Sequence, residues 1–234
     1  MTGVQTCALP ISGTGTDVGK TFVTAHLIKA LRDKGIQAGY YKAALSGAYY
    51  EEGKLIPGDA KYVMDIADFK EDYDKCVSYT FETAVSPHLA AQIEGIEVNL
   101  DKIKVDYKAL LNKYEYLFVE GSGGIICPIQ ATEKAFILLE DIIKRLDLDI
   151  LVVARAGLGT INHTVLTVKY IQSQGLAVKG IILNGYEEGN TLHEDNKRMI
   201  EALTGVEVIA VIPSATEENV GINLDAEKLM SLCK

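Results

Sequence analysis

The chain has few cysteines and no long apolar run, and each absence removes a class of protein. Its four cysteines are widely scattered without Cys-x-x-Cys spacing, at Cys7, Cys76, Cys127 and Cys233. We expect free thiols in a reducing compartment and no zinc site. No apolar run approaches the length of a transmembrane helix, and no basic segment precedes a signal-like core. These observations predict a cytoplasmic protein with no membrane partner.

Basic residues are also in deficit. The formal net charge is −9 at pH 7, and no basic cluster stands out. This balance argues against nucleic acid as the main partner. With 234 residues and 48% hydrophobic content, the chain can bury one substantial core, so a single domain is expected. The histidines have no metal-ligand spacing, and they are His26, His88, His163 and His193.

The most informative feature that is present is a glycine-rich loop over residues 12–21, with the sequence Ser-Gly-Thr-Gly-Thr-Asp-Val-Gly-Lys-Thr. Its glycines allow consecutive backbone N–H groups to turn around an anion. Lys20 would bring a positive charge to the β- and γ-phosphates of a nucleotide, and the Thr21 hydroxyl would hold Mg²⁺. Five residues separate Gly13 from Gly19, one more than in the common phosphate loop. A helix expected from about Gly19 would direct its positive N-terminus at the phosphates.

Short apolar runs alternate with helical patterns along the rest of the chain. Near-continuous hydrophobicity is typical of parallel strands covered on both faces. The pattern predicts a doubly wound, mostly parallel α/β sheet flanked by helices, a three-layer sandwich like that of phosphate-loop NTPases. Ligands gather at the carboxyl ends of the strands in such sheets. Strands are expected at 39–41, 116–119, 150–154, 180–183 and 208–212, helices at 135–146 and 162–174 with Gly175 closing the second, and a polar surface excursion at 186–196.

Residues 1–11 do not fit the first buried strand that should precede the loop. Pro10 would remove a ladder hydrogen bond, and Gln5 and Thr6 interrupt the apolar run. The peptide at 2–11 also resembles the translation of a sequencing-library adapter. We therefore expect residues 1–11 to be a non-native segment and residues 12–234 to form one ATP-binding domain, with an unusual edge-like first strand as the alternative.

Three further side chains are candidates for the same site. Glu120 ends a buried strand and could hold Mg²⁺, or it could be a solvated acid in a glycine-rich loop. Lys42 follows the second strand and could stabilise a transferring phosphoryl group, although a surface lysine is the more common explanation. Asp59 opens a helical pattern and by itself indicates only an N-cap.

Taken together, the ordered motifs resemble the dethiobiotin synthetase family from Ser12 to about Leu232. The motifs are the long phosphate loop, Lys42 with Ser46, Asp59, Ser-Pro-His at 86–88, Glu-Gly-Ser-Gly-Gly at 120–124, and Gly-Leu-Gly-Thr-Ile-Asn-His at 157–163. The resemblance implies that ATP and CO2 convert 7,8-diaminononanoate to dethiobiotin, ADP and phosphate, through a carbamate and a carbamic–phosphoric anhydride.

The resemblance also assigns roles to individual residues. Lys42 and Lys20 become catalytic, and Thr21, Asp59 and Glu120 become the Mg²⁺ ligands. Asn184 would recognise adenine. Ser46 would contact the substrate. The resemblance also implies a helix N-terminus that binds the substrate carboxylate across a homodimer interface, formed by Leu158, Gly159, Thr160, Ile161 and Asn162. The implied ATP-site residues are Gly13, Thr16, Asp17, Val18, Gly19, Lys20, Thr21, Phe22, Asp59, Glu120, Gly121, Ser122, Gly123, Asn184, Gly185, Pro213, Ser214 and Ala215.

Two alternatives share the expected core. A partition or scaffold ATPase switch typically has an extra lysine near the start of the loop, where this chain has Ser12, Gly13 and Thr14. An amide-forming ligase acting on a corrin-ring acid usually adds a glutaminase domain, for which this chain is too short. Both features favour the synthetase.

Overall fold

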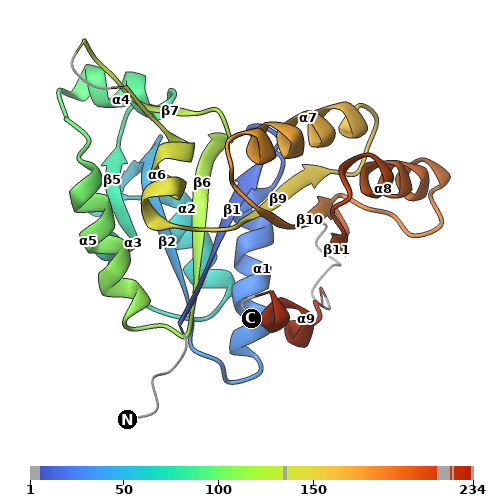
Figure 1. Cartoon of the computed structure of the whole chain (residues 1–234). Helices are drawn as coiled ribbons and strands as arrows, with labels where there is room; N and C mark the ends of the chain where they lie inside the picture. Colours follow the sequence, from blue (N-terminus) through green and yellow to red (C-terminus); the bar gives the residue numbers. More distant parts are fainter. Residues whose placement is uncertain (1–5, 134–135, 215–221, 223, 233–234) are drawn as a thin grey trace.

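The computed structural model describes residues 6–133, 136–214, 222 and 224–232 (Figure 1). Its centre is a seven-stranded sheet in the order β11-β10-β9-β1-β6-β2-β5, in which every pairing is parallel. This confirms the predicted doubly wound class. The strands are β1 (Cys7–Gly13), β2 (Ala38–Ser46), β5 (Val77–Phe81), β6 (Tyr116–Gly124), β9 (Ile150–Arg155), β10 (Val178–Asn184) and β11 (Val208–Ile212).

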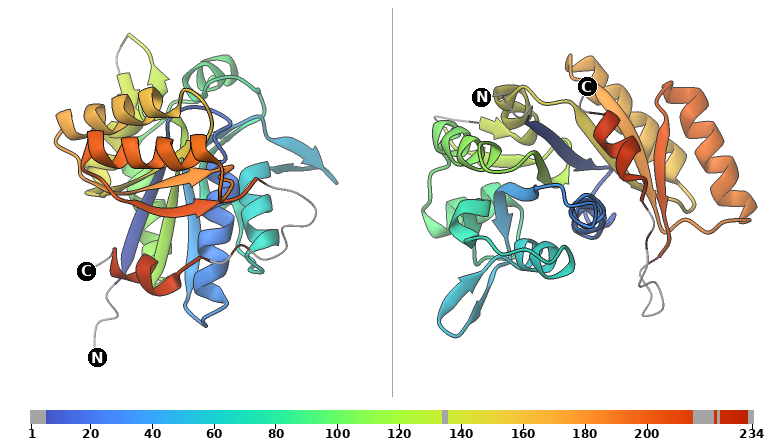
Figure 2. Two further views of the ribbon diagram at one scale, coloured as in Figure 1. Left: turned by 90° about the vertical axis from the view of Figure 1, so that its right-hand side faces the viewer. Right: turned by 90° about the horizontal axis from the view of Figure 1, so that it is seen from below.

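Helices cover both faces of the sheet, as Figures 1 and 2 show. Successive strand residues point to opposite faces, so Tyr40 packs in the core under α1, α2 and α9, whereas Tyr41 packs in the core on the other face. Both tyrosines are fully buried. The helices are α1 (Lys20–Arg32), α2 (Gly58–Ile66), α3 (Tyr73–Cys76), α4 (Pro87–Glu94), α5 (Leu100–Leu111), α6 (Leu139–Leu146), α7 (Thr160–Ser173), α8 (Thr191–Thr204) and α9 (Ala226–Ser231).

Two small hairpins lie outside the main sheet. The first pairs β3 (Tyr49–Glu51) with β4 (Lys54–Ile56) and projects from the body of the molecule in Figure 2. The second pairs β7 (Pro128–Ala131) with β8 (Phe136–Leu138). No helix in the part of the chain that the structure describes has the length and apolarity needed to cross a membrane.

All five predicted strands are present, but one local prediction is wrong and a second is incomplete. The expected helix at 135–146 begins only at Leu139, because residues 136–138 form β8 and pair with β7. Residue 135 lies outside the described residues. The segment 186–196 is not merely a surface excursion. Asn190 caps α8 there, and Asn196 is buried with its side-chain amide donating to the carbonyl of Ala156 at 2.8 Å.

Residues 7–11 form most of a central strand, contrary to the expectation that this stretch does not fit one. The N–H of Cys7 donates to the carbonyl of Glu115, on the side that faces β6. Because N–H groups alternate sides along a strand, the nitrogen of Pro10 faces β9. Pairing with β9 starts only at Ile11, one residue later. The strand therefore accommodates Pro10, because its hydrogen-bond ladder with β9 begins only after this residue.

We still propose that residues 1–11 are not native, since proline is a poor choice for a central strand. Replacing Pro10 with valine should provide an N–H toward β9 and let the ladder to β9 begin one residue earlier. The gain should be about 1 kcal/mol, a rise in melting temperature of about 2–4 °C. Calorimetry measures this. Pro87→Val is the control, because Pro87 begins α4, where a missing N–H costs nothing. An unchanged melting temperature for Pro10→Val would contradict the prediction.

The expectation of free thiols throughout is wrong for Cys7, which is disulfide-bonded. Leu232, near the end of the chain, lines the same surface cavity as Thr6 and Cys7. The fold thus places Leu232 near Cys7, a proximity that cysteine spacing cannot reveal. Cys76 and Cys127 are free, as expected, and both are buried, whereas Cys233 lies outside the described residues.

Candidate active site

The phosphate loop connects β1 directly to α1, as its sequence predicts. Gly19 precedes the helix at φ 93° and leaves the first turn without a side-chain cap, so the helix N–H groups remain available to a ligand. Lys20 folds back over the loop, and its Nζ donates to the carbonyl of Gly15 at 3.0 Å. A Cβ at Gly13 would come within 2.8 Å of Val18 Cγ2, so the tight loop requires glycine there.

The predicted catalytic and metal-binding side chains meet at the end of the loop. Lys42 and Glu120 are register partners on β2 and β6, and Lys42 Nζ donates to Glu120 Oε1 at 2.7 Å. The same ammonium donates to Asp59 Oδ2 at 2.6 Å. The Thr21 hydroxyl donates to Glu120 Oε1 at 2.9 Å. Four side chains from α1, α2, β2 and β6 therefore form one cluster.

Asp59 is not the N-cap that its position after Pro57 and Gly58 indicates. Helix α2 begins at Gly58, and its N-cap is Pro57. Asp59 therefore lies within the first turn. Its carboxylate turns toward Lys42, and the pair links α2 to the sheet.

The surroundings shift the pKa values of the two lysines in opposite directions. Burial alone would lower the pKa of Lys42, but the adjacent carboxylates of Glu120 and Asp59 outweigh it and raise that pKa above the ordinary value. Burial, and then repulsion from Lys42, lowers the pKa of Lys20. Lys42 is therefore a firmly protonated cation, whereas Lys20 lacks a carboxylate partner of its own in the described network.

Tyr40 belongs to this cluster although its sequence position indicates only a buried strand residue. Its hydroxyl donates to Glu120 Oε2 at 3.1 Å, and the side chain is fully buried. Burial, followed by the nearby charge of Glu120, raises the pKa of Tyr40 well above its usual value. The tyrosine is therefore a permanent donor that holds one oxygen of Glu120 while the other faces Thr21 and Lys42.

We expect Tyr40→Phe to destabilise the fold by about 1.5–3 kcal/mol, since it leaves a buried carboxylate oxygen without its donor. It should also raise the Mg²⁺ concentration needed for half-maximal turnover, because Glu120 would be less well oriented. Thermal unfolding and a Mg²⁺ titration of activity measure the two effects. Tyr50→Phe is the control, as Tyr50 is 61% exposed in the β3–β4 hairpin. Equal behaviour of the two variants would contradict this role.

The cluster opens into a cavity of about 910 Å³. Ser46, at the end of β2, lies on its wall. Gly121 does not, and its lack of a side chain is explained by packing, since a Cβ there would come within 2.8 Å of Leu139 Cδ2. The predicted residues that line this cavity are Thr16, Asp17, Gly19, Lys20, Thr21, Phe22, Lys42, Ser46, Asp59, Glu120, Ser122 and Gly123.

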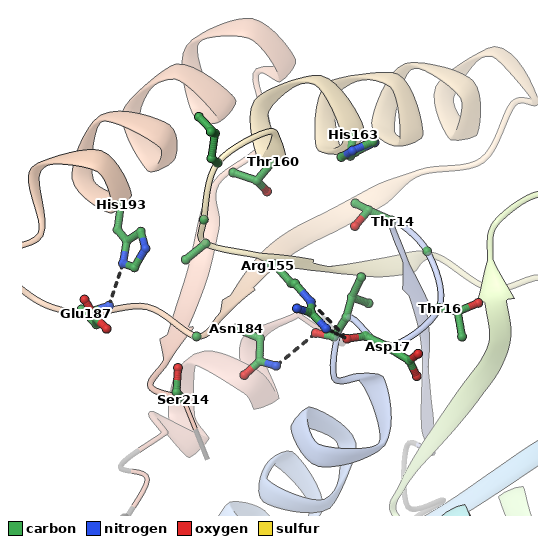
Figure 3. A pocket seen from close by; sticks show the side chains of 16 residues that line it. Thr14, Thr16, Asp17, Arg155, Thr160, His163, Asn184, Glu187, His193 and Ser214 are labelled. Carbon is green, nitrogen blue, oxygen red and sulfur yellow. Dashed lines mark hydrogen bonds between the residues drawn. The ribbon is translucent and has the colours of Figure 1, made fainter. Parts of the chain in front are cut away.

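A second cavity, of about 800 Å³, lies on the other side of the phosphate loop (Figure 3). Asn184, at the end of β10, donates from Nδ2 to the carbonyl of Val18 at 3.0 Å. Its Oδ1 is buried without a hydrogen-bond partner among the described residues. Gly185 and Ser214 also line this cavity, Pro213 precedes Ser214 in the chain, and Ala215 lies outside the described residues.

The predicted substrate residues do not share one cavity within a single chain. Ser46 lines the cavity with Lys42, whereas Leu158 and Thr160 line the cavity with Asn184. Gly159 is the N-cap of α7, at φ 89°, and Ile161 and Asn162 follow in its first turn. Neither cavity is lined by these last three.

Sequence reasoning also missed Arg155, at the carboxyl end of β9. It lines the second cavity together with His193 and Glu187, whose N–H donates to His193 Nδ1 at 3.0 Å (Figure 3). A charged residue that directly follows a buried strand was the available signal, because ligands in open parallel sheets collect at those ends.

Comparison with known proteins identifies the family and the fold. A family model described as an AAA domain matches residues 8–219. An ATP-dependent dethiobiotin synthetase BioD of Clostridium novyi is 56% identical over 209 residues, 89% of this chain and 88% of that protein. A synthetase of the same name from Clostridium perfringens is 51% identical over 203 residues, which are 87% of this chain and 89% of that protein. The cell-division ATPase MinD of Pyrococcus furiosus has the same fold, with a TM-score of 0.57 at 19% identity over 97% of this chain and 99% of that one. This chain belongs to the dethiobiotin synthetase family.

Proposed function

We propose that the protein uses ATP and CO2 to convert 7,8-diaminononanoate to dethiobiotin, ADP and phosphate. One observation carries the proposal at the level of geometry: Lys42 is buried between Glu120 and Asp59, beside Thr21 of the phosphate loop. A cation held in this position suits a reaction that must bring two anions together. Membership of the family supplies the choice of substrate.

The proposed chemistry has three steps. One amine of the substrate captures CO2 as a carbamate and loses a proton. A carbamate oxygen attacks the γ-phosphorus of ATP, the bond to the bridging oxygen breaks, and ADP leaves. The second amine attacks the carbonyl carbon of the resulting anhydride, the bond from that carbon to the phosphate oxygen breaks, and the cyclic urea forms with release of phosphate and a proton.

The two lysines offset the charge of these reactants. Lys20, folded over the loop, would neutralise the β- and γ-phosphates, and Lys42 would face the carbamate. The uncapped N-terminus of α1 adds backbone donors at the phosphates. Most of the catalysis would come from positioning and charge stabilisation, as in phosphoryl transfer generally.

The donor set around Glu120 suits Mg²⁺, which prefers oxygen ligands and usually binds to one or two carboxylates together with phosphates. Thr21 provides a hydroxyl, and Asp59 and Glu120 provide carboxylates. Within the described ranges, no three histidine, cysteine or acidic side chains gather to hold a metal ion by themselves. Binding would therefore depend on the nucleotide as well, and the ion would supply charge compensation for the phosphates.

Adenine and the substrate carboxylate would bind on the other side of the loop. The unpartnered Oδ1 of Asn184 is an acceptor suited to the adenine amino group. In a homodimer, the first turn of α7 of one protomer would bind the carboxylate of the substrate that lies in the active site of the other protomer. Two facts support this arrangement: Ser46 and Leu158 line different cavities of one chain, and Leu158 is 91% exposed. Sedimentation of the protein and of Leu158→Asp would test the dimer.

The activity test is phosphate release from Mg·ATP with and without 7,8-diaminononanoate plus bicarbonate. Release that depends on the diamine, with dethiobiotin detected by mass spectrometry, is the expected result. A folded protein that binds ATP but ignores the diamine would overturn the substrate assignment. The partition-type switch or the amide-forming ligase would then be the better explanation.

A further inference from the structure

Arg155 makes a two-donor contact with the phosphate loop. It is the last residue of β9, and its side chain is exposed. Its Nε and Nη2 both donate to the backbone carbonyl of Asp17, at 3.1 and 2.5 Å (Figure 3). A planar guanidinium can direct two donors at one acceptor, which the single ammonium of a lysine cannot reproduce.

The residue that it holds has a strained backbone. Asp17 lies in the left-handed region at φ 57°, where residues other than glycine are disfavoured. Its conformation sets the direction of the turn that leads through Val18 and Gly19 into α1. The N–H groups after this turn are those that would contact phosphate, so their alignment depends on Asp17 staying in this region.

A second side chain holds the next carbonyl along the loop. Asn184 donates to the carbonyl of Val18, and Asn184 is the register partner of Arg155 on the adjacent strand β10. Two neighbouring strand ends thus hold two consecutive carbonyls of one turn. Among the ion pairs of the described ranges, none involves Arg155, so the loop carbonyl is its principal contact.

We propose that Arg155 is a positioning residue that keeps Asp17 left-handed and so holds the phosphate loop in its anion-binding shape. This inference rests on the proposed binding of nucleotide phosphates by the loop. Arg155 acts through the backbone of Asp17, so its effect is the same for a nucleoside diphosphate and a triphosphate.

The first test measures calorimetric binding of ADP and of ATP to Arg155→Gln and Arg155→Lys. Both variants should bind both nucleotides about tenfold more weakly, as expected for loss of hydrogen bonds from a charged donor. In steady-state assays the KM for ATP should rise more than kcat falls. Arg198→Ala is the control, because Arg198 lies on the surface of α8 and pairs with Asp195. Rescue by lysine, or a loss confined to ATP, would instead indicate direct charge contact with the γ-phosphate and overturn the proposal.

The second test asks whether the effect passes through the backbone of Asp17. Glycine adopts positive φ readily, so Arg155→Gln should cost much less affinity in an Asp17→Gly background. Asp17→Ala is the matched control, since it removes the carboxylate but keeps the disfavoured backbone. An equal cost in both backgrounds would overturn the proposal.

The third test needs no nucleotide. In the nucleotide-free protein, amide hydrogen exchange over residues 13–20 should be faster in Arg155→Gln than in the unmodified protein, and unchanged exchange would overturn the proposal. Failure of diamine-dependent turnover alongside these results would overturn the proposed substrate while leaving the role of Arg155 intact.

Discussion

Replacing Lys42 with methionine should lower turnover about 10²- to 10³-fold and destabilise the fold at the same time. The first effect follows from loss of a preorganised charge at the reacting groups. The second follows from the geometry, since the side chain of Glu120 is 1% exposed and would lose its cationic partner. Breaking such a buried pair costs about 3–5 kcal/mol. Phosphate release and thermal unfolding measure the two effects.

Mg²⁺ should partly restore the stability of Lys42→Met, because it offers a second cation to the same carboxylates. With ADP present, the rise in melting temperature on adding Mg²⁺ should therefore be larger in the variant than in the unmodified protein. Lys61→Met is the control, since Lys61 pairs with Asp65 on the surface of α2 and such pairs contribute little. Full activity would contradict the catalytic role of Lys42, and an unchanged melting temperature would contradict its structural role.

Replacing Lys20 with alanine should lower turnover by about 10³-fold while the fold persists. Lys20 donates only to the carbonyl of Gly15 in the described network, and Lys42 repels it, so its removal leaves no buried carboxylate unpaired. The charge facing the phosphates would nevertheless be lost, and such contacts dominate phosphoryl transfer. Phosphate release, ATP binding and calorimetry together measure the result.

Lys29→Ala is the matched control for Lys20→Ala, because Lys29 lies on the same helix but pairs with Asp33 at the surface. It should change neither turnover nor stability appreciably. Near-normal turnover in Lys20→Ala would contradict the proposed role of the phosphate loop in binding the nucleotide phosphates. A loss of stability as large as that of Lys42→Met would show that Lys20 is mainly structural.

Much of the site could be predicted because its signals are local. Ten consecutive residues around Gly13 and Gly19 are enough to predict an anion-binding loop, since such a tight turn requires glycines at set positions. Uninterrupted apolar runs such as 150–154 show that both faces of a strand are covered. The same local signals gave a wrong prediction for the N-terminal segment, where residues 7–11 form most of β1. Whether Pro10 is tolerated depends on which neighbour its nitrogen faces, and only the register of β1 decides this.

The sequence by itself determined the fold class, the phosphate loop and the family, because each depends on residue types at short spacing. Only the tertiary structure decided how distant side chains combine. It placed Lys42 opposite Glu120, added Tyr40 to that pair, and directed Arg155 at Asp17. The physical reason is the parallel sheet: its register brings residues far apart in sequence to one edge, and hydrogen-bond geometry then selects the pairs that interact.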